Sequence, residues 1–215
     1  MSSQDTARGT KTYRRSTYPA IDPTQPELST KGKSAVVTAR GRASGRAADS
    51  VGGAIAELAP DTKVFTYVVD IVDEDAVKAA FAAFAAKLGG RAIDVLVANA
   101  GYMANLATIA DADPSDWWSG FEINIKSNFH LMPAYVQHAP TDGSGAVIHV
   151  SMSSVHWPYM PDFSSYRASK AGATKLFELF ARENPALFVL QVHRPHWRHD
   201  HALQVRAHDR GAAVR

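Results

Sequence analysis

Residues 93–101 read Ile-Asp-Val-Leu-Val-Ala-Asn-Ala-Gly. The first six form a nearly continuous apolar run, which is typical of a buried strand in a parallel sheet. Asn99, Ala100 and Gly101 end that run with small and turn-forming residues. Open α/β sheets bind ligands at the carboxyl ends of their strands, so these three residues are expected to border a ligand site. An ordinary strand-to-loop turn is the alternative interpretation.

Similar apolar runs alternate along the chain with segments of helical periodicity. Strands are expected at 35–38, 64–69, 93–98, 146–150 and 187–192, and helices at 74–88, 114–135 and 165–182. Strands that alternate with helices, each strand nearly continuous in apolar residues, predict an α/β fold: a doubly wound parallel sheet with helices on both faces.

The composition narrows the class of protein. A chain of 215 residues with 46% hydrophobic and 20% charged residues predicts a globular domain with one core. Its 23 basic and 21 acidic side chains are interspersed, so no nucleic-acid partner is expected. There is no cysteine, no signal-peptide pattern and no apolar run near the ~18 residues of a membrane span. We therefore expect a cytoplasmic protein without a membrane partner.

Three segments differ in composition. Residues 1–33 are rich in Ser, Thr, Pro and charge and predict an irregular leader. Residues 34–192 carry the alternating strands and helices. Residues 193–215 contain five His and five Arg without a structural period and predict an irregular tail. His196, His199 and His201 could bind a metal, but nothing positions them, so no metal site is expected.

Tyr166 and Lys170 carry the clearest chemistry. They lie four positions apart in the helix expected at 165–182, and therefore on one face. An ammonium beside a phenol lowers the phenol's pKa toward working pH, as a proton shuttle requires. Ser153 and Ser154 precede this pair by 13 and 12 positions.

Five pieces occur in a fixed order: Asp70 after a strand, Asn99-Ala100-Gly101 after the next, Asn124, the serine pair, and Tyr166-x-x-x-Lys170. A lone Tyr-x-x-x-Lys is a weak signal, but over residues 30–192 the ordered set resembles the short-chain dehydrogenase/reductase family. The resemblance implies a Rossmann-like sheet, a homodimer or homotetramer, and an NAD(P)-dependent oxidoreductase. Its substrate would be a small-molecule carbonyl or alcohol.

The resemblance also implies catalytic roles. Tyr166 would be the general acid or base at the substrate oxygen, and Lys170 would lower its pKa and hold the nicotinamide ribose. A serine hydroxyl would steady the carbonyl oxygen. Ser153 has the usual family spacing and is preferred, while Ser154 has the more typical local context. Asn124 would hold a relay water, or would only bond to a neighbouring backbone group.

Cofactor contacts follow from the same resemblance. Asp70 would bind the adenine amino group, with Ile71 packed beside the ring, although an Asp before a helix can equally be a cap. The Asn99 to Gly101 segment would border the cofactor. Arg40 or Arg42 would meet the 2′-phosphate of NADP, which is favoured slightly over NAD, unless both arginines are simply solvated.

The chain departs from the family after its first strand. The family's phosphate loop reads Thr-Gly-x-x-x-Gly-x-Gly, whereas this sequence reads Thr38-Ala-Arg-Gly-Arg-Ala-Ser-Gly45. Only 25 residues separate Thr38 from Val64, where two helices, a strand and their connections take roughly 40. We expect a sheet short by about one strand and one helix, truncated in this loop region and at the C-terminus. A non-catalytic remnant or a scaffold protein is therefore the alternative function.

Overall fold

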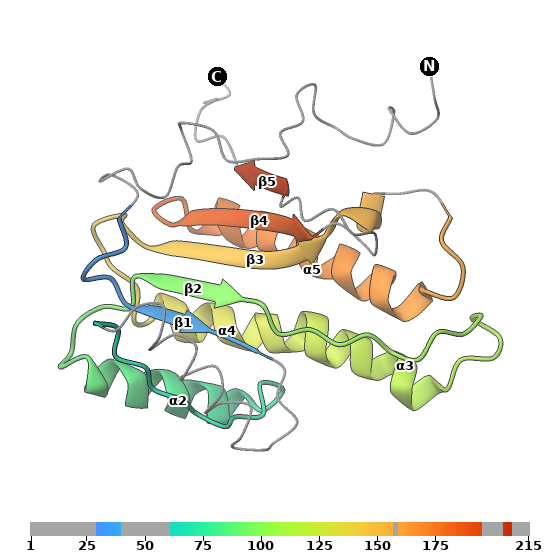
Figure 1. Cartoon of the computed structure of the whole chain (residues 1–215), viewed down its shortest axis with the longest axis horizontal. Helices are drawn as coiled ribbons and strands as arrows, with labels where there is room; N and C mark the ends of the chain where they lie inside the picture. Colours follow the sequence, from blue (N-terminus) through green and yellow to red (C-terminus); the bar gives the residue numbers. More distant parts are fainter. Residues whose placement is uncertain (1–28, 40–60, 157–158, 195–203, 208–215) are drawn as a thin grey trace.

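The structure is a computed structural model that describes residues 29–39, 61–156, 159–194 and 204–207 (Figure 1). Arg40, Arg42 and the glycines of the first loop lie outside these residues, as do the three histidines considered as metal ligands and most of the leader and tail.

Within the described residues, five strands form one sheet in the order β1-β2-β3-β4-β5. They are β1 Ala35–Val37, β2 Val95–Ala98, β3 Ala146–Met152, β4 Phe188–Arg194 and β5 Gln204–Ala207. The first four run parallel, and β5 is antiparallel to β4. The carboxyl ends of the parallel strands therefore meet at one end of the sheet (Figure 1).

The helices follow the expected segments closely. They are α2 Glu74–Lys87, α3 Pro114–Phe121, α4 Ser127–Val136 and α5 Ser164–Glu183. Asp73 caps α2 by accepting hydrogen bonds from the amides of Asp75 and Ala76. A π-helical turn, η3 Glu122–Lys126, separates α3 from α4, and a 3₁₀ turn, η4 Ser153–His156, follows β3. No described helix is long and apolar enough to cross a membrane.

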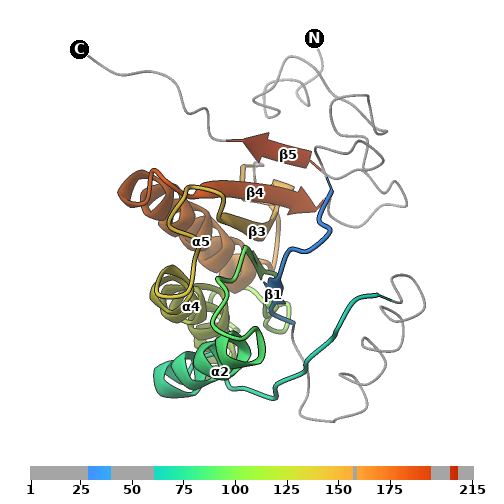
Figure 2. The same ribbon diagram turned by 90° about the vertical axis from the view of Figure 1, so that its left-hand side faces the viewer.

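The helices α2, α4 and α5 lie on one face of the sheet (Figure 2). The parallel strands follow one another in sequence order, so right-handed crossovers place the described connecting helices on the same side. The buried core includes one residue from each of β2, β3 and β4: Leu96, Val147 and Val189. The Rossmann-like α/β class is thereby confirmed in shortened form: the described part holds one of the two windings of a doubly wound sheet.

The strand expected at Val64–Val69 is absent from the described sheet. This segment has no regular secondary structure, and Phe65 packs edge-on against Phe84 of α2 with ring centroids 6.2 Å apart. A strand needs a neighbour for its backbone hydrogen bonds, and no described strand lies beyond β1 to supply them. Phe65 therefore packs on a helix instead, while Val64, Tyr67 and Val68 stay exposed.

The tail contributes to the sheet, contrary to expectation. Residues 193–194 complete β4, where Arg194 pairs with Met152, and residues 204–207 form β5. The prediction of an irregular segment was wrong for these residues. Where a strand ends depends on backbone pairing with a neighbouring strand. The pattern of side chains along the sequence does not reveal this pairing.

Candidate active site

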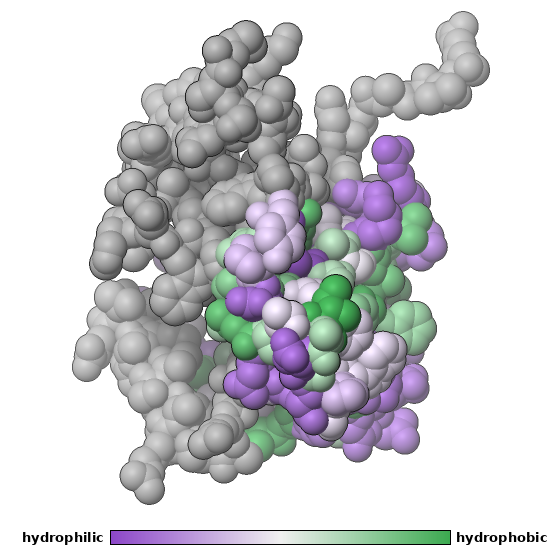
Figure 3. All heavy atoms as spheres, turned by 90° about the vertical axis from the view of Figure 1, so that its right-hand side faces the viewer, coloured by the Kyte–Doolittle hydropathy of each residue, from purple (hydrophilic) through white to green (hydrophobic). Residues whose placement is uncertain are grey.

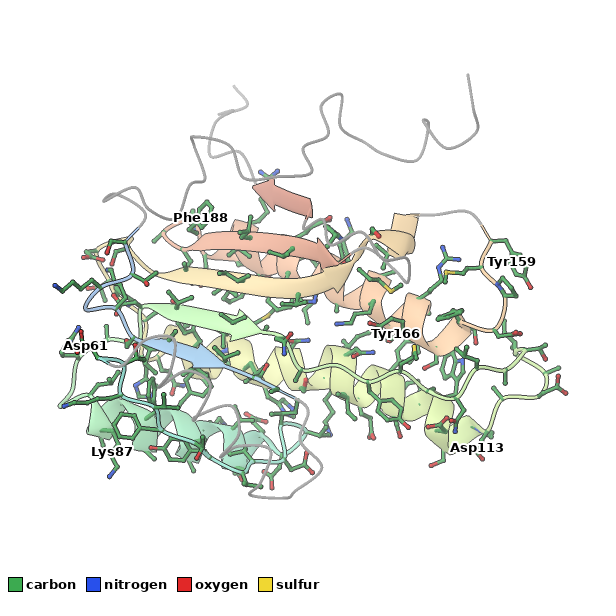
Figure 4. The ribbon with its side chains drawn as sticks, in the orientation of Figure 1. Asp61, Lys87, Asp113, Tyr159, Tyr166 and Phe188 are labelled. Carbon is green, nitrogen blue, oxygen red and sulfur yellow. The ribbon has the colours of Figure 1, made fainter. Side chains whose placement is uncertain are left out.

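Lys170 lies on the buried face of α5, with only 4% of its surface exposed. Its Nζ donates a hydrogen bond to the carbonyl oxygen of Val150 at 3.0 Å. Burial lowers the pKa of this ammonium to about 8. Tyr166 lies one helical turn earlier, beyond the carboxyl ends of the strands (Figure 4). The structure thus places the predicted pair on one helix, at the carboxyl end of the parallel strands.

Asn124 lies at the centre of η3 and is fully buried. Its Nδ2 donates to the Tyr102 carbonyl and to Ser169 Oγ, both at 2.8 Å, and its Oδ1 accepts from the Tyr102 amide at 2.9 Å. These partners belong to the loop after β2 and to α5. The bonds are therefore tertiary contacts and differ from the local backbone bond considered as the alternative. The π turn interrupts the expected helix 114–135 at this residue, as π turns often do at functional sites.

Gly101 brings the loop after β2 against both of these side chains. A Cβ added at Gly101 would lie 3.2 Å from Asn124 Oδ1 and 3.2 Å from Lys170 Nζ. Glycine permits the close approach and leaves space beside the buried ammonium. Three residues predicted separately from the sequence thus converge on one point.

Thr38, at the end of β1, organises the adjacent backbone. Its Oγ1 accepts hydrogen bonds from the amides of Asn99 and Ala100, each at 3.1 Å, and its carbonyl accepts from Asn99 Nδ2 at 3.0 Å. From the sequence, Thr38 was expected only to end a strand and begin the first loop. A hydroxyl at the carboxyl end of a strand is the signal that could have identified it, because neighbouring parallel strands end at the same edge.

The serine and adenine-site predictions have a weaker structural basis. Ser153 is buried at the start of η4, directly after β3, while the side chain of Ser154 lies outside the described residues. Asp70 is exposed and accepts from the Val72 amide at 3.0 Å, as a turn-capping residue would, and Ile71 packs partly against the core. The roles assigned to these residues remain predictions.

A cavity of about 210 Å³ adjoins Tyr166 between the loop after β2 and the start of α5. Its lining includes Asn105, Asp113, Trp117 and Phe163. Exposed apolar side chains and polar ones intermix over this end of the molecule (Figure 3). Apart from Tyr166, this lining was not predicted from the sequence, because the loop carries no recognisable motif.

Asp116 fixes one wall of the cavity. Its carboxylate accepts hydrogen bonds from the Tyr102 hydroxyl and, at 2.7 Å, from the Asn105 amide. A parallel bridge between Ala107 and Phe163 ties the same loop to the segment before α5. The loop is therefore held to α3 and to α5, the two helices that flank the cavity.

Comparison with known proteins agrees with this geometry. A family model described as short chain dehydrogenase matches residues 25–187. Among curated relatives, short chain dehydrogenase tazN of Aspergillus terreus is 30% identical over 202 residues, covering 82% of this chain and 43% of the relative. Short chain dehydrogenase pigC of Monascus ruber is 27% identical over 211 residues, covering 86% of this chain and 68% of the relative.

Solved structures share the fold. Levodione reductase superposes with a TM-score of 0.68 at 23% identity, covering 79% of this chain and 64% of that one. NAD⁺-bound xylitol dehydrogenase gives 0.65 at 23% identity, covering 75% and 59%. The chain thus spans about two fifths to two thirds of the length of these proteins. On the family match and the shared fold, this chain belongs to the short-chain dehydrogenase family.

Proposed function

We propose that this chain is an NAD(P)-dependent oxidoreductase that transfers a hydride between nicotinamide and the carbonyl or alcohol group of a small molecule. The observation that carries the proposal is the convergence of the Lys170 ammonium and the Asn124 amide on Gly101. Tyr166 lies one helical turn from Lys170 and lines the adjoining cavity. Family membership supports the general reaction class.

Tyr166 and Lys170 would handle the proton. In the direction of reduction, the Tyr166 hydroxyl donates its proton to the substrate oxygen, and in oxidation the phenolate takes the proton from the alcohol. The buried cation of Lys170 favours the phenolate electrostatically. Because burial already lowers the pKa of Lys170 to about 8, its own proton can be exchanged near neutral pH.

Ser153 and Asn124 would complete the arrangement. A hydroxyl at the end of β3 can donate a hydrogen bond to the substrate oxygen while negative charge develops there. Both donors of the Asn124 amide are used by Tyr102 and Ser169, whereas its Oδ1 accepts a hydrogen bond from the Tyr102 amide and has a second lone pair. That lone pair can accept from a water that continues the proton path from Lys170.

The residues at Gly101 fit the nicotinamide end of a dinucleotide, because the missing side chain leaves a cradle beside Lys170 Nζ. Lys170 would hold the ribose, and Asn99 and Ala100 would border it. The bound nicotinamide supplies or accepts the hydride. Arg40 would select NADP over NAD through the 2′-phosphate, and Asp70 and Ile71 would meet the adenine.

We further propose a homodimer or homotetramer formed through α3, α4 and α5. Trp118, Phe129 and Leu179 are each more than half exposed on these helices. Phe177, on the same helix as Leu179, is instead fully buried in the core. Residues two apart do not share a helix face, so α5 turns one apolar side chain to the core and another, on a different face, to the proposed interface.

Titration of the purified chain with NADPH and NADH, followed by fluorescence and by melting temperature, tests the reaction class. We expect saturable cofactor binding. We also expect turnover of a carbonyl or alcohol substrate, and Tyr166→Phe should abolish this turnover. Tyr159→Phe is the matched control, since that tyrosine is 88% exposed. No binding at millimolar cofactor would contradict the proposal and favour the remnant or scaffold alternative.

A further inference from the structure

One face of α5 packs on the sheet directly behind the proposed active site. Lys170, Thr174 and Phe177 recur at helical spacing along it. Lys170 Nζ reaches the carbonyl of Val150, and the hydroxyls of Thr174 and Ser151 lie 2.9 Å apart. The position of the ammonium therefore depends on the register of α5 against β3.

A buried pair, His149 of β3 and Gln191 of β4, joins this helix face to both strands. The His149 ring is fully buried and stacks on Phe177, with centroids 4.1 Å apart and planes 12° apart. Its Nδ1 lies 3.2 Å from Gln191 Oε1, and Gln191 Nε2 donates to the Thr174 carbonyl at 3.1 Å. Two strands and one helix thus share one set of contacts.

These contacts determine the tautomer of His149. Because the Gln191 nitrogen already donates to a carbonyl, its oxygen faces the imidazole and must accept. The proton of His149 therefore lies on Nδ1, and Nε2 carries a lone pair. Nε2 is buried and has no hydrogen-bond partner among the described residues.

The ring is also held neutral. Burial, and then the positive charge of Lys170, lower the pKa of His149 to about 3. The groups that face it are Lys170 on α5 and Gln191 and His193 on β4. A protonated ring would add a second cation beside the ammonium and a buried N–H without an acceptor.

We propose that His149 and Gln191 form an uncharged brace that locks α5 in register on β3 and β4 and thereby holds the Lys170 ammonium against Val150. His149 is thus a positioning residue, and its catalytic meaning rests on the proposed function. A slip of one helical residue moves the helix by about 1.5 Å, enough to break a 3.0 Å hydrogen bond. Neither brace residue needs to touch substrate or cofactor.

The test reads Lys170 directly. Protein labelled with ¹³C at lysine Cε is titrated by NMR, and Lys170→Met assigns the signal. The wild-type midpoint should lie near pH 8. His149→Leu and Gln191→Leu should raise it toward the ordinary lysine value of about 10.4, because the freed side chain moves toward solvent. His149→Gln, which keeps a hydrogen-bonding group, should leave it near the wild-type value.

Val147→Ala is the matched control, since it removes core volume from the same strand and keeps both brace residues. Its midpoint should stay at the wild-type value. If His149→Leu does not fold, Gln191→Met makes the same test with a side chain of similar length. An unchanged Lys170 midpoint in folded His149→Leu or Gln191→Met protein would overturn the brace. The titration needs no turnover, so absence of cofactor-dependent activity in the wild type would defeat the proposed function alone.

Discussion

The ammonium of Lys170 donates to the backbone carbonyl of Val150 at 3.0 Å, from a side chain that is almost completely buried. A neutral acceptor compensates only part of the lost hydration, so the ammonium form is destabilised in the folded protein. This loss of stability occurs at the position where the proposed chemistry needs a cation.

The free energy of unfolding should therefore rise with pH between the folded and the unfolded pKa of Lys170. Its pKa is about 8 in the folded protein and about 10.4 when unfolded, so the unfolded chain binds the extra proton between these values. The penalty is fully present below pH 8 and relieved as the pH rises to about 10.4. The free energy of unfolding of the wild type should gain roughly 3 kcal/mol over that window relative to Lys170→Met, measured by urea titration at each pH. Parallel pH profiles for the two proteins would contradict the burial of the charge.

Gly101→Ala should weaken cofactor binding more than it weakens the fold. The added Cβ would lie 3.2 Å from both Asn124 Oδ1 and Lys170 Nζ, so one of these side chains must move by a few tenths of an ångström. We expect the dissociation constant for NAD(P)H to rise about tenfold, equivalent to about 1.4 kcal/mol. Fluorescence titration measures the binding, with melting temperature as the control. Unchanged affinity would place the cofactor away from Gly101.

Thr38→Val should destabilise the chain by roughly 2 kcal/mol, because the amides of Asn99 and Ala100 lose their shared acceptor. Thr38→Ser keeps the hydroxyl and should cost clearly less. Equilibrium unfolding in urea compares the two variants. A loss for Thr38→Val no larger than that for Thr38→Ser would contradict the role of the hydroxyl as the shared acceptor.

Gly120→Ala should disturb the contact between α3 and α5. The new Cβ would overlap Ser165 Oγ, whereas Ser165 Cβ lies at an ordinary 3.6 Å. We expect a loss of about 1–3 kcal/mol for the single variant. Adding Ser165→Ala should recover part of that loss, although it removes the hydrogen bond from Ser165 Oγ to the Trp117 carbonyl. A double-mutant cycle that shows no coupling between the two positions would mean that contact with Ser165 Oγ does not cause the loss.

Local pattern predicted most of the elements. The run at residues 93–98 contains β2, and the periodicity at 165–182 matches α5 to within one residue at each end. The same reasoning failed at Val64–Val69, whose apolar residues suit a strand equally well. That segment lacks a neighbouring strand in the described sheet, and the presence of a neighbour is not a local property.

The sequence by itself determined which chemical groups are available: a tyrosine and a lysine on one helical face, and a glycine after a strand. Only the tertiary structure decided that Gly101 would meet Asn124 and Lys170, that Thr38 would bind the neighbouring strand end, and that His149 would lie behind the ammonium. Spacing along a chain fixes neighbours on one helix or strand. Contacts between elements depend on how the crossovers stack helices on the sheet, and that arrangement gives the buried lysine its lowered pKa.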